Sequence, residues 1–144
     1  MIVIPNQECN MNIIKGSCLC GSVTFECKDT FQQFHLCHCQ QCQKTSGSAH
    51  ASNLFTDVDN ISWLAGAEKI KRYDVPGRTI TSAFCSDCGS PVPYVSGSGK
   101  ALVVPAGSLD TPPSTSPQDN IFWAERACWY EHGVNAKKYA GFPE

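Results

Sequence analysis

The sequence of 144 residues has no long hydrophobic run. No stretch approaches the roughly 20 consecutive apolar residues that a transmembrane helix requires, so no membrane span is expected. The opening segment MIVIPNQECN contains neither a basic cluster nor a long apolar core, which makes it a poor signal peptide. These absences predict a cytoplasmic protein that does not bind membranes.

An excess of positive charge is also missing. Lys and Arg number 11 against 13 Asp and Glu, for a formal net charge of -2. Without a basic stripe, nucleic-acid binding through phosphate neutralisation is not expected. Apolar residues make up 42% of the chain and charged residues 17%, proportions typical of a compact fold rather than a disordered chain.

The chain length predicts a single domain, residues 13–144, preceded by a loose tail, residues 1–12. Short β-rich segments recur between turn-forming residues, which predicts an all-β fold. The predicted strands are GSVTFEC, HASNLF, ISWLAG, KIKRYD, TITSAFC, SPVPYVSG, ALVVPAGSL and NIFWAERACWYEH. One short helix is expected directly after Cys39, from Gln40 to about Ser46, with Gly47 as its stop signal.

Ten cysteines dominate the chemistry of the sequence. Most fall into tight groups: CLC at 18–20, CHCQQC at 37–42 and CSDCG at 85–89, with Cys9, Cys27 and Cys128 isolated. Cysteines this close bridge poorly, because a disulfide constrains both the Cα separation and the Cβ directions. They converge easily on one ion, so metal binding is favoured over a disulfide framework.

Tetrahedral zinc with four thiolates suggests how the groups divide. The CxxCG knuckle supplies two ligands and the CxC supplies two more, which predicts a closed structural site of Cys18, Cys20, Cys85 and Cys88. Cys37, Cys39 and Cys42 then remain for a second ion with a fourth position open, as in catalytic zinc sites. A rival zinc ribbon would instead combine Cys39 and Cys42 with Cys85 and Cys88, leaving Cys18, Cys20 and Cys37 over.

The charge of the three-cysteine site narrows its chemistry. Three thiolates on Zn²⁺ leave a net charge of about -1, so the ion is a weak Lewis acid but readily accepts a further sulfur. Binding a substrate thiol there would favour its nucleophilic thiolate form. Thiol activation is therefore favoured over peptide or ester hydrolysis.

Four segments resemble the family of glutathione-dependent formaldehyde-activating enzymes, which also includes centromere protein V. They are GSCLCGSVTF, CHCQQCQKTSGSAHA, FCSDCGSPV and PQDNIFWAERACWYEH, and the resemblance runs from about Lys15 to Pro143. It implies an Mss4-like arrangement of several coiled antiparallel β-sheets around two zinc ions, one structural and one catalytic. The residues that match the family's ligands are the four and the three cysteines grouped above.

The resemblance also implies a reaction. The family's namesake activity joins glutathione and formaldehyde into S-hydroxymethylglutathione, formally a carbon-sulfur lyase reaction in reverse. The implied partners are a small thiol and an aldehyde, and assembly into a homo-oligomer stays open. Two alternatives remain: a non-enzymatic, zinc-stabilised protein-binding module of Mss4-like fold, and a sulfoxide reductase that uses Cys27 or Cys128.

Other polar residues near the motifs have two readings each. His35, His38 and His50 could serve the site, although packed or surface rings explain them as well. Lys44, Thr45, Ser46 and Arg78 could donate to a carboxylate-bearing thiol, although helix-end and turn positions also account for them. Phe84 and Tyr94, like the three tryptophans, are expected to pack in the core or at its edges.

Overall fold

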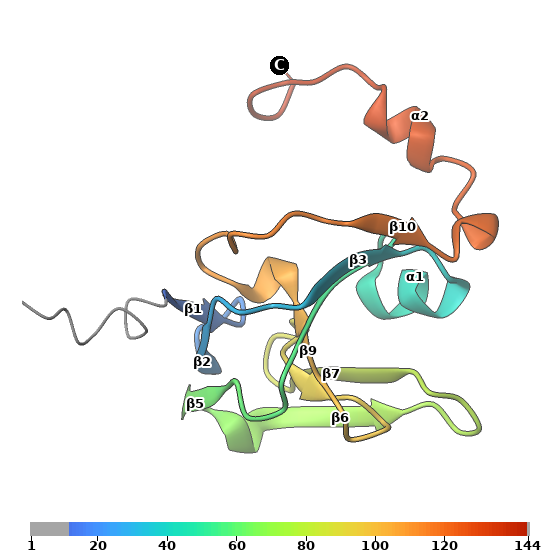
Figure 1. The fold of residues 1–144 in the computed structure, drawn as a ribbon. Coiled ribbons are helices and arrows are strands. Elements are labelled where there is room, and N and C mark those ends of the chain that lie inside the picture. Colours follow the sequence, from blue (N-terminus) through green and yellow to red (C-terminus); the bar gives the residue numbers. More distant parts are fainter. Residues whose placement is uncertain (1–11, 144) are drawn as a thin grey trace, which may run out of the picture.

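A computed structural model describes residues 12–143 of the chain. Residues 1–11 of the predicted tail, with Cys9, lie outside the described residues. Strands predominate and form three separate sheets (Figure 1), which confirms the predicted all-β class. No helix among the described residues is long and apolar enough to cross a membrane.

The three sheets are built from short strands. The first has the order β1 (Ile13–Ser17), β2 (Thr24–Lys28) and β5 (Ser62–Ala65). The second has the order β10 (Asp119–Ile121), β3 (Gln33–Cys37), β4 (Ala51–Thr56), β9 (Leu102–Pro105) and β8 (Tyr94–Val95). The third is the hairpin of β6 (Ile70–Asp74) and β7 (Thr81–Cys85). Pairings within residues 12–143 are antiparallel except that of β10 with β3, which is parallel.

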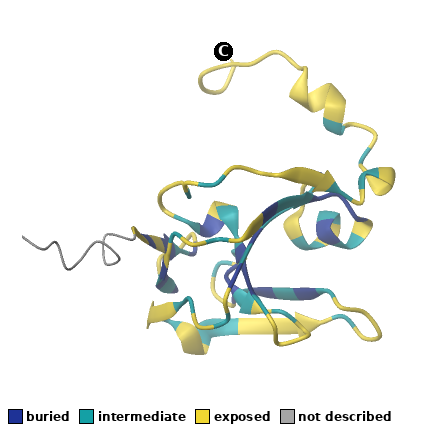
Figure 2. Cartoon of the chain, in the orientation of Figure 1, coloured by how far each residue is buried: buried dark blue, intermediate teal, exposed yellow. Residues whose placement is uncertain are grey.

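Alternating side chains give each sheet a buried face. In β2, Phe25 and Cys27 point inward while their neighbours are more exposed, as the two-residue period of a strand requires. Leu54 of β4 packs with Leu102 and Val104 of β9 in the core of the large sheet. Figure 2 shows the buried positions in the body of the molecule, while the segment after β10 is largely exposed.

The helix α1 (Gln40–Ser46) lies where the sequence predicts it. Cys39 caps its N-terminus, since the Cys39 sulfur accepts a hydrogen bond from the backbone N–H of Cys42. Gly47 ends it with φ 65°, a left-handed conformation that glycine adopts at low cost. The start of the helix therefore positions two cysteines of the second motif, Cys39 as its N-cap and Cys42 in its first turn.

The predicted strand over residues 120–132 is wrong beyond Ile121. The β10 strand stops there because Phe122 takes φ 54°, a conformation that an extended strand does not contain. A 3-10 turn (Trp123–Glu125) and helix α2 (Tyr130–Val134) follow. The alternation of aromatic residues that suggested a strand reflects ring packing around His38, described below.

Candidate metal centres and the adjoining cleft

Four cysteines meet between the first and third sheets. The sulfurs of Cys18, Cys20, Cys85 and Cys88 all lie within 4.8 Å of one another. Cys18 and Cys20 follow β1, while Cys85 ends β7 and Cys88 closes the turn after it. A metal ion held here would tie the start of the described chain to its middle.

Local turns point these sulfurs inward. Gly89, with φ 78°, donates its N–H to the carbonyl of Cys85 at 2.7 Å and closes the knuckle. The N–H of Val23 donates to the Cys18 sulfur at 3.2 Å. The Ser90 hydroxyl, 3.3 Å from the Cys88 sulfur, lowers the pKa of Cys88 to about 5 together with backbone N–H groups. Hydrogen bonds of this kind favour the thiolate, which is the metal-binding form.

Three further cysteines form a second cluster. The sulfurs of Cys37, Cys39 and Cys42 also lie within 4.8 Å of one another, and all three residues are buried. Cys37 ends β3, and the other two belong to the cap and first turn of α1. The contact between the Cys37 and Cys42 side chains lowers the pKa of Cys37 to about 6. The same contact raises the pKa of Cys42. Within residues 12–143, no fourth Cys, His, Asp or Glu joins this cluster.

The structure thus groups the seven clustered cysteines as four and three. Cys39 and Cys42 are not brought together with Cys85 and Cys88, so the zinc-ribbon alternative is not what the fold builds. The nine cysteines of the described chain are all free thiols. Each cluster has the sulfur donors and the spacing to hold a metal ion.

A cleft of about 240 Å³ opens beside the three-cysteine cluster. Its walls come from α1, the β6–β7 hairpin and all five strands of the large sheet. The lining includes, besides Cys37 and Cys42, the residues His35, Thr45, Ser46, Ser52, Asn53, Phe55, Thr79, Ile80, Thr81, Tyr94 and Ile121. Apart from the cysteines, Tyr94 and His35, these side chains carry no titratable group. The interior is therefore nearly neutral, with hydroxyl and amide groups among apolar ones.

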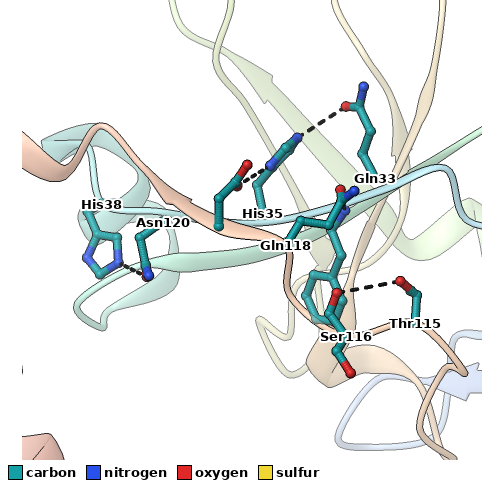
Figure 3. A network of polar contacts seen from close by, with 9 residues as sticks. Gln33, His35, His38, Thr115, Ser116, Gln118 and Asn120 are labelled. Atoms are coloured by element: carbon teal, nitrogen blue, oxygen red, sulfur yellow. Dashed lines mark hydrogen bonds and ion pairs between the residues drawn. The ribbon is translucent and has the colours of Figure 1, made fainter.

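His35 lines this cleft and is held by two partners. Its Nδ1 lies 2.5 Å from an Asp119 carboxylate oxygen, and its Nε2 lies 3.3 Å from the Gln33 side-chain oxygen (Figure 3). Asp119 belongs to β10, which pairs with β3. The sequence alone gives no sign of this pairing, because the two strands are more than 80 residues apart.

Tyr94 also lines the cleft, although the sequence predicts only core packing for it. Burial raises the pKa of its hydroxyl to about 12, and nearby Cys42 acts in the same direction. The guanidinium of Arg72 sits over its ring, 5.9 Å from the centroid. Within the described chain, no side-chain hydrogen bond uses the Tyr94 hydroxyl. The cleft thus contains a neutral phenol that is free to donate.

His38 has a packing role. Its ring is fully buried, and its Nε2 lies 2.9 Å from the side-chain oxygen of Asn120 (Figure 3). Three aromatic rings surround it, with centroids 4.9 to 5.0 Å from the centroid of the His38 ring: those of His50, Trp123 and Tyr130. His38 therefore anchors the chain after β10 to the cysteine loop, and His50 does not line the cleft.

The remaining candidates lie in different places. Thr45 and Ser46 line the cleft, but their hydroxyls also donate to the Cys42 carbonyl at 3.2 and 2.7 Å, as expected at a helix end. Lys44 lines a separate hollow with Trp129. Cys27 is buried, which raises its pKa to about 11, and Cys128 is exposed. A buried thiol with a raised pKa is a poor nucleophile, which disfavours Cys27 as the reactive residue of a sulfoxide reductase.

Comparison with known proteins gives a family and a fold. The family model described as glutathione-dependent formaldehyde-activating enzyme matches residues 13–125. A crystal structure of a Rhodobacter sphaeroides protein matches with 23% identity and a TM-score of 0.57, covering 74% of this chain and 98% of that one. At this identity the likeness concerns the fold alone. No curated protein matches the chain.

Proposed function

The chain belongs to the glutathione-dependent formaldehyde-activating enzyme family, and from this premise we propose that it catalyses the reversible addition of a small thiol to an aldehyde. Glutathione and formaldehyde are the proposed pair, and the reaction is that of a carbon-sulfur lyase. The observation that carries the proposal is a buried three-cysteine cluster on the wall of a cleft.

Zinc suits both clusters by their donor sets. Four cysteine sulfurs form a complete tetrahedral shell, so Cys18, Cys20, Cys85 and Cys88 are assigned a structural ion. Cys37, Cys39 and Cys42 supply three ligands and are assigned a catalytic ion. When bound there, zinc would supply a fourth coordination position that favours a substrate thiol in its thiolate form.

The cleft supplies the rest of the chemistry. In the forward direction a carbon-sulfur bond forms between the thiolate and the aldehyde carbon, and the carbonyl π electrons move to oxygen. Tyr94, on the cleft wall, donates a hydrogen bond to that oxygen, which finally takes up the proton that the thiol lost. Such a donor stabilises developing negative charge more in a partly desolvated site than in water. Elimination runs through the same contacts in reverse.

The proposed activity requires reduced cysteines in both clusters. That requirement is met in a reducing compartment, where thiols persist. We therefore place the protein in the cytoplasm.

Cobalt substitution followed by glutathione titration tests the proposal. Co²⁺ reports thiolate ligation through its charge-transfer absorption, so a fourth sulfur at the three-cysteine cluster changes the spectrum. We expect glutathione to change it saturably in the wild type and not in Cys37→Ser. An unchanged spectrum would instead support the alternative from the sequence, a zinc-stabilised protein-binding module with both ions structural.

A further inference from the structure

A contact between a turn and a helix spans one side of the cleft. Arg78 lies in the turn between β6 and β7, where its backbone N–H donates to the carbonyl of Val75 at 3.1 Å. With its amide oxygen facing the turn, Gln41 of α1 accepts a hydrogen bond from Arg78 Nε at 3.1 Å and a second one from Nη1. The residues that follow each partner, Cys42 and Thr79, both line the cleft. The contact therefore joins two walls of the cleft, and it places the Arg78 guanidinium beside the cleft rather than among its lining side chains.

This guanidinium has spare hydrogen-bonding capacity. Arginine offers five N–H donors, and the Gln41 oxygen engages two of the nitrogen atoms. The two other arginines of the described chain have carboxylate partners: Arg72 pairs with Asp74 and Arg126 with Glu131. Within residues 12–143, no carboxylate forms an ion pair with Arg78. Its positive charge beside the cleft is therefore unbalanced by an adjacent acid.

Because the described residues leave no free cation in the cleft interior, the binding of a negatively charged ligand depends on cations beside the cleft. Among the side chains that line it, His35 is the one basic group, and Asp119 already pairs with it. A thiol whose sulfur reaches Cys37 and Cys42 has no interior cation to receive an attached carboxylate. The carboxylate would be stabilised where a guanidinium can donate two parallel hydrogen bonds.

We propose that Arg78, positioned by Gln41, binds the carboxylate of the thiol substrate, so that the cleft selects carboxylate-bearing thiols over neutral ones. This inference rests on the proposed function, because it assumes that a thiol reaches the three-cysteine cluster. The proposed function concerns the sulfur of the thiol, whereas this inference concerns its carboxylate. An experiment can therefore contradict the inference and leave the proposed function intact.

Binding to the cobalt-loaded protein tests the proposal with three thiol probes. Glutathione carries carboxylates, glutathione diethyl ester is the same peptide with both masked, and 2-mercaptoethanol is small and neutral. We expect Arg78→Gln to weaken glutathione binding about fivefold or more while changing the affinity for the other two less than about twofold. Added salt should weaken glutathione binding to the wild type more than to Arg78→Gln.

Lys44→Gln is the matched control. It removes the same charge from α1, the helix that carries Gln41, but Lys44 faces the hollow beside Trp129. Glutathione affinity should be unchanged in this variant. Unaltered binding of 2-mercaptoethanol to Arg78→Gln also shows that the variant remains folded around its metal.

Three results would overturn the inference. Arg78→Gln could leave glutathione binding intact, or it could weaken the binding of all three thiols equally. In the third result, Lys44→Gln would weaken glutathione binding as much as Arg78→Gln does. Each of these leaves the proposed function standing, since thiols still bind. A cobalt spectrum that none of the thiols changes would instead remove the proposed function and this inference together.

Discussion

At the level of single residues, Tyr94 makes the most specific claim about chemistry. Tyr94→Phe removes the hydroxyl and keeps the ring, so it should slow the catalysed addition about 10- to 100-fold and leave glutathione binding unchanged. Exchange NMR between free formaldehyde and its glutathione adduct measures the rate above the uncatalysed background. Tyr73→Phe, on the exposed face of β6, should match the wild type. Equal rates in the two variants would eliminate Tyr94 as the donor.

The same hydroxyl predicts a pH dependence. Burial raises the pKa of Tyr94 to about 12, so the neutral donor form persists as pH rises and is lost only near that value. The rate ratio of wild type to Tyr94→Phe should therefore stay constant from about pH 7 to 10. A ratio that falls toward one near pH 9 would show that the phenol ionises too early for this role.

Single residues also show where sequence reasoning succeeds. The preferred grouping of the seven clustered cysteines agrees with the four-cysteine and three-cysteine clusters of the structure, whereas spacing alone also allowed a zinc ribbon. Tyr94 and His35 could not be found in this way. Each reaches the cleft through a strand pairing, β8 with β9 and β3 with β10, between segments whose register the sequence does not reveal.

At the level of secondary structure, the turn after β5 contains a glycine whose replacement would clash with the backbone. Gly66 has φ 77°, and a Cβ there would lie 2.1 Å from the carbonyl oxygen of Ser22. Gly66→Ala should therefore lower the free energy of unfolding by at least about 3 kcal/mol, since strain and a backbone clash add. Urea denaturation of the zinc-loaded protein measures this loss.

Gly99 provides the control for that substitution. It has a similar φ of 76°, but a Cβ at this position would have nothing within 4 Å of it. Gly99→Ala should cost only the conformational strain, about 1 kcal/mol. Equal losses at the two glycines would show that the approach to Ser22 is not a close packing contact.

The elements differ in how well the sequence predicts them. Helix α1 is correct in both bounds, because Cys39 and Gly47 provide local capping signals. The predicted strand over residues 120–132 fails after Ile121, because its aromatic residues follow the buried ring of His38 rather than a sheet. Local signals thus determine an element well, and tertiary packing can overrule periodicity.

For the whole molecule, the two clusters should contribute unequally to stability. Cys88→Ser opens a four-cysteine site that joins β7 to the chain after β1, so it should lose one zinc and much of the cooperative unfolding transition. Cys37→Ser should lose the other zinc but keep the β-sheet circular dichroism. Cys128→Ser, outside both clusters, should keep both ions. Zinc analysis with thermal denaturation distinguishes the three variants, and similar stability of Cys88→Ser and Cys37→Ser would contradict the division of roles.

Anomalous diffraction at the zinc absorption edge, on crystals of the zinc-loaded protein, is the most direct test of that division. We predict two peaks: one among the sulfurs of Cys18, Cys20, Cys85 and Cys88, and one among those of Cys37, Cys39 and Cys42. The second ion should have a fourth ligand that is not a protein side chain. A single peak, or a side chain in that fourth position, would contradict the proposed thiol chemistry.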